Sequence, residues 1–279
     1  METGRASKTA FRVAMRRAIH QILDQPCVLV DPIAVPLLGP RFRFDREREL
    51  HPIAHAFRAF MAARSRYAED RLGEAVVSGV TQYAVLGAGL DTFAYRNPFP
   101  NLRVFEVDFP ATQEWKRALL TEARISLPDS LTFVPLDFEH KTLAAGMTEA
   151  GFDLDASAFF GWLGVVPYLT RDAFGATLRT IAQLPAGSGV CFDFALSPQS
   201  MSPMRRKAFE ALAARVAAVG EPFQLFFTPT ELETELQSAG FHAIEFADSD
   251  RLNALYFDNR SDRLKLPPEG LGMMASAWV

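Results

Sequence analysis

Between Thr81 and Leu196 the chain alternates short apolar runs with segments of helical pattern, and this alternation constrains the fold more than any other feature. The apolar runs are YAVLGAG, LRVFEVD, LTFVPLDFE, ASAFFGWLGVV and GVCFDFAL, and ATQEWKRALLTEARI and RDAFGATLRTIAQL lie between them. Runs rich in Val and Phe at this spacing, with helices between them, are typical of βαβ units and a mostly parallel sheet. The pattern predicts an α/β, Rossmann-like fold.

Helical patterns flank this core. Thr9 to Leu23 carries apolar residues at helical spacing, and a longer helical segment runs from about Asp45 to Val77, with Gly79 as its C-cap. Residues 197–227 have the pattern of a helix between loops, an insertion over the strand ends where a substrate lid is expected. Two final runs, HAIEFAD and LNALYFDNR, would complete a seven-stranded sheet.

These boundaries predict one domain over residues 1–279, because α/β folds carry this length around a single sheet. It divides into an N-terminal helical cap (1–78), a core (79–196), a lid insertion (197–227) and the end of the sheet (228–279). In the last part, Thr228, Pro229 and Glu231 form the start signal of a helix, and Gly240 marks its end.

Composition favours a globular, soluble protein with a sizeable core, since 49% of the residues are hydrophobic. The net charge is −4 and the arginines are scattered among acids, which gives no footprint for a polyanion and favours small-molecule or protein partners. Cys27 and Cys191 both lie in apolar sequence, and no run has the length of a signal-peptide core or a membrane span. We expect a cytoplasmic protein that binds neither nucleic acid nor membrane; the sequence does not indicate an oligomeric state.

The turn after YAVL contains two glycines, in the stretch Gly87-Ala88-Gly89-Leu90-Asp91. In an open parallel sheet, ligands bind outside the carboxyl ends of the strands, and the first βα turn is the usual site. Small residues let a ligand approach the backbone, so this loop is a candidate binding site; a tight turn that needs positive φ is the alternative explanation.

The next apolar run ends in Glu106 and Asp108, about twenty residues after Gly87, where an acid can accept hydrogen bonds from ribose hydroxyls. Because a strand alternates faces, both acids point to the same side. Asp108 is preferred, since it lies nearer the end of the strand. The predicted ligand therefore contains a nucleoside, which makes residues 79–196 a nucleoside-binding core.

The loop does not fit a dinucleotide. Thr92 stands where the dinucleotide pattern has a third small residue, and Asp91 beside it would repel a diphosphate. A nucleoside with a cationic amino-acid tail suits this aspartate, and S-adenosylmethionine has that chemistry. At the end of LTFVPLDFE, Asp137 could bind the adenine amino group while Phe138 packs beside the base; a helix N-cap and a core phenylalanine are the alternative.

These motifs resemble a known family. LGAGLDTFAYR, FEVDFPATQEWKR, LDFE and GVVPYLT are similar to the leucine carboxyl methyltransferase family, and more closely to its bacterial branch of S-adenosylmethionine-dependent O-methyltransferases. SKTA...RRA, DPIAVPLLG, AARSRYAED and AGF...NALYFDNR also match, so the resemblance covers nearly the whole chain. It implies a class I methyltransferase fold, S-adenosylmethionine as cofactor, and methyl transfer to a carboxyl or hydroxyl oxygen of a small metabolite.

The resemblance also implies site residues. Arg64 in AAR would bind the carboxylate of the cofactor's methionine tail, with Arg66 as the second candidate, since a guanidinium is a bidentate partner for a carboxylate. Leu163 departs from the family, because many members carry a glutamate there; any contact of that glutamate must be absent or replaced. Trp162 is either an aromatic wall of the site or a core residue. The family's other cofactor positions map onto Gly87, Gly89, Asp108, Asp137 and Phe138.

Methyl transfer from a sulfonium is an in-line displacement, so the enzyme supplies mainly alignment and a dry pocket. A carboxylate acceptor is already ionised and needs no base, whereas a phenol or alcohol does. The resemblance places Tyr168 near the acceptor, where its hydroxyl could orient a carboxylate; a packing tyrosine is the alternative. His140 is the only histidine near a predicted strand end, either as a base or as a solvated loop residue.

Other hypotheses remain open. His51 and His55 have the spacing of a metal pair but lack a third ligand, so we expect no metal site. A non-catalytic S-adenosylmethionine-binding protein is compatible with Leu163. A nucleotide-dependent oxidoreductase is disfavoured by Asp91 and Thr92.

Overall fold

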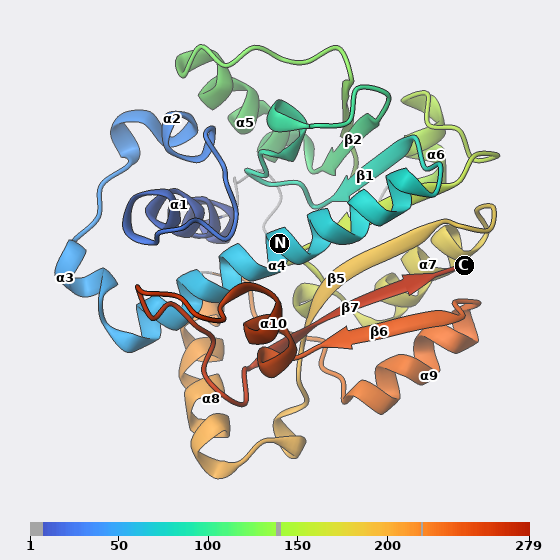
Figure 1. The fold of residues 1–279 in the computed structure, drawn as a ribbon. Helices are drawn as coiled ribbons and strands as arrows, with labels where there is room; N and C mark the ends of the chain where they lie inside the picture. The colour runs from blue at the N-terminus through green and yellow to red at the C-terminus, as the bar shows by residue number, and fades with distance from the viewer. Residues whose placement is uncertain (1–7, 138–140, 219) are drawn as a thin grey trace.

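The computed structural model describes residues 8–137, 141–218 and 220–279, which form α-helices around one sheet (Figure 1). The seven strands lie in the order β3-β2-β1-β4-β5-β7-β6. They are β1 (Gln82–Leu86), β2 (Arg103–Asp108), β3 (Leu131–Pro135), β4 (Ala158–Trp162), β5 (Gly189–Ala195), β6 (Ala243–Ala247) and β7 (Gly272–Trp278). Neighbouring strands are parallel except that β7 is antiparallel to both β5 and β6. The predicted mostly parallel, seven-stranded fold is confirmed, and strand order reverses beside β1, where such sheets bind ligands.

Helices cover both faces of the sheet (Figure 1). They are α1 (Lys8–Leu23), α2 (Ala34–Leu38), α3 (Arg46–Glu49), α4 (Pro52–Val77), α5 (Pro110–Glu122), α6 (Leu143–Glu149), α7 (Arg171–Ala182), α8 (Pro203–Ala217), α9 (Pro229–Ala239) and α10 (Ser249–Tyr256), with 3₁₀ turns η1 (Gly39–Arg41), η2 (Phe93–Arg96), η3 (Val166–Tyr168) and η4 (Pro198–Ser200). Apolar residues of α4 and α10 pack on one face, and those of α6, α7, α8 and α9 on the other. No helix in these described ranges combines the length and apolarity needed to cross a membrane.

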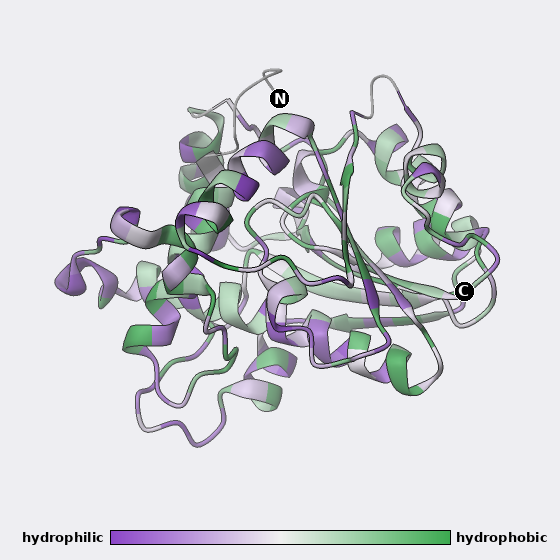
Figure 2. Cartoon of the chain, turned by 90° about the horizontal axis from the view of Figure 1, so that it is seen from above, coloured by the Kyte–Doolittle hydropathy of each residue, from purple (hydrophilic) through white to green (hydrophobic). Residues whose placement is uncertain are grey.

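The alternation of side chains along each strand divides the core in two. Phe159 packs toward α4 and its neighbour Phe160 toward the opposite face, and both are fully buried. Figure 2 shows the hydrophobic strands at the centre and hydrophilic residues on the outer helices and loops. A third apolar cluster joins α1, α2 and α5 through residues such as Ala18, Leu38 and Leu120. The N-terminal helices are therefore attached to α5 and, through Phe133, to β3.

The predicted helix ends are largely confirmed. The first helix, α1, begins one residue before the expected Thr9. The segment expected from Asp45 to Val77 is instead broken at Leu50 and His51, because Pro52 begins a new helix and His51 caps it by accepting from the Ile53 N–H at 3.4 Å. Gly79 ends α4 with φ of 104°, the left-handed conformation that favours glycine.

The later helices follow their sequence signals. Residues 203–217 of the predicted insertion form α8, the helix expected between loops. Thr228 and Glu231 form a reciprocal capping box at the start of α9, and Gly240 ends it with φ of 110°.

The position of the seventh strand was predicted wrongly. LNALYFDNR does not form a strand; its first residues lie in α10, which Asp248 caps by accepting from the Arg251 N–H at 2.9 Å. The strand is β7, GMMASAW, which lies between β5 and β6. Its small side chains Ala275 and Ala277 are fully buried there. The segment contains no β-branched residue, so pairing with the neighbouring strands, and not its own strand propensity, makes it a strand.

Candidate functional site

The glycine loop after β1 leaves its backbone bare between two other segments. Gly87 and Gly89 have φ of 66° and 50°, in the left-handed region. A Cβ atom on Gly87 would lie 2.4 Å from Cγ2 of Val165, in the turn after β4, and one on Gly89 would lie 3.2 Å from Cβ of Ala10 in α1. Both glycines are therefore required by conformation and by the close packing of Val165 and Ala10, as the tight-turn alternative expects; a ligand along this backbone stays a prediction.

Asp108, at the end of β2, is bound to this loop. Its Oδ2 accepts from the Gly89 N–H at 2.5 Å, and its Oδ1 accepts from the Phe109 N–H at 2.7 Å. Burial raises the pKa of Asp108, although these two N–H groups act in the opposite direction. A carboxylate has about four acceptor sites and the Thr112 side chain also bonds to Asp108, so about one site is left for a ribose hydroxyl. The structure brings Asp108 to the predicted place; its contact with the ribose stays a prediction.

Glu106 points to the same side of β2 but lies deeper. It is 1% exposed, and its Oε2 accepts from Nζ of Lys116 in α5 at 2.6 Å. Burial raises the pKa of Glu106 to about 7, although Lys116 opposes this shift. Its Oε1 is buried without a hydrogen-bond partner among the described residues. The structure thus favours Asp108 over Glu106 as the acid that faces a ligand, with Glu106 as one half of an internal ion pair.

Asp91 ties the loop to the N-terminal helices. It accepts from the Phe93 N–H at 2.8 Å and from Nη1 of Arg17 in α1 at 3.2 Å. Burial would raise the pKa of Asp91, but nearby cations, Arg17 foremost, outweigh it and lower that pKa. Asp91 is therefore ionised, and its carboxylate already has structural partners. Arg17, which also donates to the Leu90 carbonyl, was missed from the sequence because it lies far from the loop along the chain.

Thr92 belongs to the same polar network. Its hydroxyl donates to Oδ2 of the fully buried Asp31 at 2.6 Å, and Nε of Arg96 lies 3.6 Å from the other oxygen of that carboxylate. Arg96 in turn pairs with Glu69 of α4. Thr92 thus needs its hydroxyl to satisfy a buried acid, which explains why a third small residue does not stand at this position.

Arg64 lies near the loop through its partners in β5 and in the turn after β4. It is 6% exposed on α4, and its Nη1 lies 3.1 Å from Oδ2 of Asp193, a buried residue of β5. The other oxygen, Oδ1 of Asp193, accepts from the Gly164 N–H at 2.6 Å. Gly164 directly precedes Val165, which contacts Gly87, so the guanidinium belongs to the same group of contacts as the glycine loop. Asp193 was not identified from the sequence.

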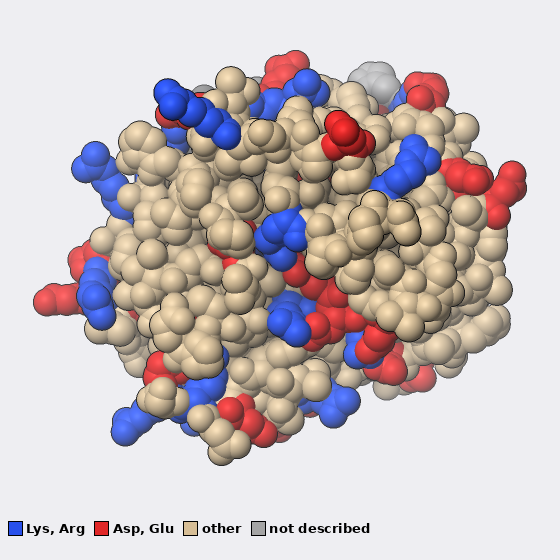
Figure 3. Space-filling view, turned by 45° about the horizontal axis from the view of Figure 1, so that its top comes forward, with Lys and Arg blue, Asp and Glu red and all other residues tan. Residues whose placement is uncertain are grey.

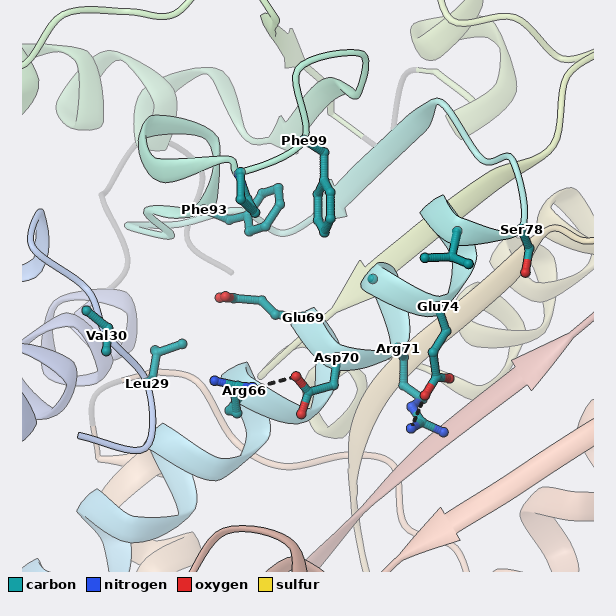
Figure 4. Close-up of a pocket in the computed structure, with 13 residues that line it drawn as sticks. Leu29, Val30, Arg66, Glu69, Asp70, Arg71, Glu74, Ser78, Phe93 and Phe99 are labelled. Atoms are coloured by element: carbon teal, nitrogen blue, oxygen red, sulfur yellow. Dashed lines mark hydrogen bonds and ion pairs between the residues drawn. The ribbon is translucent and has the colours of Figure 1, made fainter. Parts of the chain in front are cut away.

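Arg66, the second candidate, points elsewhere. Its side chain is 47% exposed and pairs with Asp70 at 2.8 Å. It lines an open groove of about 930 Å³ along the second half of α4, with Phe93 and Phe99 on the opposite wall (Figure 4). The groove extends toward Ser78, near the start of β1, and so leads away from the carboxyl ends of the strands.

Charges in this groove are largely paired within the chain. Asp70 pairs with Arg66 and Glu74 with Arg71, as the dashed lines in Figure 4 show. On the face in Figure 3, acidic side chains form a band flanked by basic ones. The groove therefore offers little unpaired charge for a ligand, and the candidate cofactor site remains at the glycine loop.

The remaining predicted cofactor residues fall in different places. Trp162 is 3% exposed and stacks on Phe174 with ring centroids 5.5 Å apart, so the structure supports the core alternative and not an aromatic wall of the site. Leu163 packs against the apolar cluster on the α4 face. Asp137 is half-buried just beyond β3, and its carbonyl accepts from the Lys141 N–H at 3.0 Å. Phe138 and His140 lie outside the described residues.

Tyr168 lies where the strand ends meet the inserted segment. Its ring centroid is 5.2 Å from that of Phe223, and its carbonyl accepts from Nε2 of Gln224 at 2.9 Å. The Gln224 N–H also donates to the Pro167 carbonyl at 2.7 Å, so residues 223–224 are docked on η3. Burial raises the pKa of Tyr168 to about 12, and Arg64 lies close enough to oppose that shift. The phenol is therefore neutral at pH 7 and can donate a hydrogen bond.

The histidines expected not to form a metal site have other surroundings. His51 caps α4, while burial, followed by the charge of Arg58, lowers the pKa of the half-buried His55. Within the described ranges, no three His, Cys, Asp or Glu side chains are grouped so that they could hold a metal ion.

Comparisons with known proteins agree with this geometry. Residues 10–182 match the model of the family described as leucine carboxyl methyltransferase. The chain is 32% identical to the “Putative S-adenosyl-L-methionine-dependent methyltransferase YktD” of Bacillus subtilis, over 95% of each protein. It superposes with a TM-score of 0.58 on a “putative methyltransferase” from Thermobifida fusca (20% identity, 92% of this chain and 96% of the other). A Streptomyces avermitilis protein of the DUF574 family gives 0.54 (18% identity, 83% and 87%). The chain belongs to the leucine carboxyl methyltransferase family and is an S-adenosylmethionine-dependent methyltransferase.

Proposed function

We propose that this methyltransferase acts on a carboxyl or hydroxyl oxygen of a small molecule that binds near Tyr168, next to the inserted segment 197–227. The observation that carries the proposal is the place of Tyr168 after the end of β4, where its ring packs on Phe223 of the inserted segment and its phenol is hydrogen-bonded to Thr9 of α1 and within range of the Arg64 charge. A phenol in that place can donate a hydrogen bond to an acceptor oxygen and hold it in line for displacement.

The residues near the loop suit S-adenosylmethionine. The loop has no side chain at Gly87 or Gly89 to block a ligand, Asp108 keeps acceptor capacity for a ribose hydroxyl, and Nε of Arg64 is buried without a partner in the described part of the chain. We assign the methionine tail to Arg64, the ribose to Asp108 and the adenine edge to Asp137. When bound, the cofactor would supply a methyl group attached to a sulfonium sulfur. The neutral thioether that leaves needs no acid catalyst.

The protonation state of Tyr168 limits its part in the reaction. With a pKa of about 12 it keeps its proton at neutral pH, so it can orient an acceptor but cannot serve as a general base. A carboxylate acceptor needs no base. A hydroxyl acceptor does. Both acceptor classes are compatible with oxygen methylation and differ in their need for a base.

A small acceptor suits the packing of the inserted segment. Phe209 of α8 stacks near Phe223 with centroids 6.0 Å apart, and Phe226 meets Phe209 edge to face at 5.5 Å. This aromatic cluster, together with the hydrogen bonds from Gln224, places residues 223–226 over η3. We infer that the segment acts as a lid that excludes water from the acceptor, which strengthens electrostatic contacts inside.

The test uses S-adenosylmethionine labelled on its methyl group and a panel of small carboxylic acids, phenols and alcohols. Labelled products are then treated with mild base, which releases volatile methanol from a methyl ester and leaves a methyl ether intact. Base-labile product identifies a carboxyl acceptor and base-stable product on oxygen identifies a hydroxyl. Label found on nitrogen or carbon, or only on macromolecules, would overturn the proposal.

A further inference from the structure

An ion pair between α4 and β5 lies beside the glycine loop and takes part in no other described charge network. The Arg64 and Asp193 side chains are both less than a tenth exposed, with 3.1 Å between Nη1 and Oδ2. Burying two charges is costly unless they have further partners. The pair lies at the strand ends, beside the turn that contacts Gly87. A contribution to stability alone therefore does not explain why it is there.

Neither member of the pair is fully satisfied. Asp193 accepts one hydrogen bond at each oxygen, from Gly164 and from Arg64, and a carboxylate can accept about four. The Nε–H of Arg64 is buried and has no acceptor in the part of the chain that the structure describes. In the described ranges the Nε atoms of Arg17, Arg71, Arg96 and Arg205 are also buried without a partner, so this atom alone does not indicate a ligand. The open acceptor sites of Asp193, together with the buried place of the pair beside the loop, give it capacity for a ligand that brings one cation and one anion.

We propose that Asp193 binds the ammonium group of the cofactor's methionine tail, while Arg64 binds the carboxylate, so that the ion pair is complementary to the amino-acid zwitterion. The inference rests on S-adenosylmethionine occupying the glycine loop, as assigned above. An ammonium donates up to three hydrogen bonds and suits the open acceptor sites of Asp193. A carboxylate accepts two parallel bonds from a guanidinium edge that includes Nε.

The same geometry explains how this chain can have Leu163 where many family members carry a glutamate. Leu163 brings no polar atom, and it packs into the apolar cluster on the α4 face. Asp193 instead delivers a carboxylate from the neighbouring strand, and its hydrogen bond to Gly164 fixes that carboxylate against the residue that follows Leu163. The acid is thus supplied by β5 where many family members place one after β4.

Gly164 keeps the guanidinium in position. Its φ is 70°, and a Cβ atom there would lie 3.0 Å from Nη1 and 3.1 Å from Nη2 of Arg64. Any side chain at this position would displace the guanidinium. Gly164 is therefore a positioning residue for Arg64, and its N–H is one for Asp193.

The first test measures four ligands on the wild-type protein by titration calorimetry. S-Adenosylhomocysteine has both charged groups, S-adenosyl-3-thiopropylamine lacks the carboxylate, the deaminated analogue lacks the ammonium, and 5′-methylthioadenosine lacks both. Loss of the ammonium should lower affinity about 10- to 100-fold, the scale of a charge-assisted hydrogen bond. Equal binding of S-adenosylhomocysteine and its deaminated analogue would overturn the assignment of Asp193, and this result needs no variant to fold.

The second test assigns each charge to its partner. Asp193→Asn should weaken S-adenosylhomocysteine and S-adenosyl-3-thiopropylamine but leave the deaminated analogue and 5′-methylthioadenosine near wild type. Arg64→Lys should weaken S-adenosylhomocysteine and the deaminated analogue only. Arg66→Gln, at the neighbouring exposed arginine, is the matched control and should change none of the four.

Three outcomes would contradict the inference, each in a distinguishable way. If Asp193→Asn weakens all four ligands equally, the residue has a general structural role. If it weakens the deaminated analogue as much as S-adenosylhomocysteine, it acts only through Arg64. If the wild type binds neither S-adenosylhomocysteine nor 5′-methylthioadenosine, the assignment of the cofactor to this loop is itself wrong.

Discussion

Replacement of Asp108 by alanine should show which of the two acids of β2, Asp108 or Glu106, contacts the cofactor. The Asp108 carboxylate accepts from the Gly89 and Phe109 N–H groups and faces the loop, whereas Glu106 is directed to Lys116 inside the protein. We therefore expect Asp108→Ala to weaken cofactor binding and Glu106→Gln to leave it near wild type.

The expected size follows from the hydrogen bonds involved. Bonds to a charged carboxylate contribute about 1.5–3 kcal/mol, and water will replace part of that at the half-buried Asp108, so we expect a loss of about 1–3 kcal/mol, roughly 5- to 150-fold in affinity. The Gly89 and Phe109 N–H groups also lose their acceptor, which should lower the free energy of unfolding by about 1–3 kcal/mol. Asp108→Asn keeps one acceptor oxygen and should fall between alanine and wild type.

Calorimetric titration with S-adenosylhomocysteine measures the affinity of wild type, Asp108→Ala, Asp108→Asn and Glu106→Gln, and urea unfolding measures their stability. If Asp108→Ala bound within about twofold of wild type while Glu106→Gln lost affinity, the choice between the acids would be reversed. If neither variant changed affinity, no acid of β2 would contact the cofactor.

Three further predictions concern the same region. Tyr168→Phe should lower kcat/KM for the methyl acceptor by roughly 2- to 10-fold, the scale of one neutral hydrogen bond, with S-adenosylhomocysteine affinity unchanged; a parallel loss of affinity would place Tyr168 at the cofactor instead. Gly87→Ala should weaken S-adenosylhomocysteine binding, because it costs about 1–2 kcal/mol in the left-handed region and meets Val165 at 2.4 Å, and adding Val165→Ala should recover part of the loss. The pKa of Glu106 is raised from 4.5 to about 7, so its protonated form is favoured in the native state; its contribution to stability is complete below about pH 4.5 and is lost as pH rises through 7. Wild-type stability relative to Glu106→Gln should therefore fall by about 3 kcal/mol between pH 4.5 and pH 8, and a constant difference in urea unfolding would contradict the shift.

Local signals were sufficient where the chemistry is local. The capping box of Thr228 and Glu231, the end of α4 at Gly79 and the turn at Gly87 and Gly89 each depend on residues close together in the chain. The choice of Asp108 over Glu106 also rested on a local fact, its nearness to the end of the strand. The capping box, the helix end and the glycine turn could be predicted because backbone conformation and neighbouring side chains fix them, whereas the contact of Asp108 with a cofactor stays a prediction.

The partners of these residues could not be found in this way. Arg17 reaches Asp91 across 74 positions of sequence, and Arg64 reaches Asp193 across 129. The sequence shows each as one charged residue among many. Trp162 illustrates the same limit, since its position before Leu163 left open whether its ring faced the site or the core, and its stacking on Phe174 appears only in the folded chain.

The sequence by itself determined the alternating architecture, the glycine loop and most helix ends, because hydrophobic periodicity and turn residues act over a few positions. It also carried the motifs that assign the family. Only the tertiary structure decided which segment became the seventh strand, since GMMASAW has no strand pattern of its own and forms a strand by pairing with β5 and β6. It likewise decided that Asp193 stands beside Arg64. Ion pairs and strand pairings are contacts between distant segments, and their energies depend on burial and distance, which only the folded chain defines.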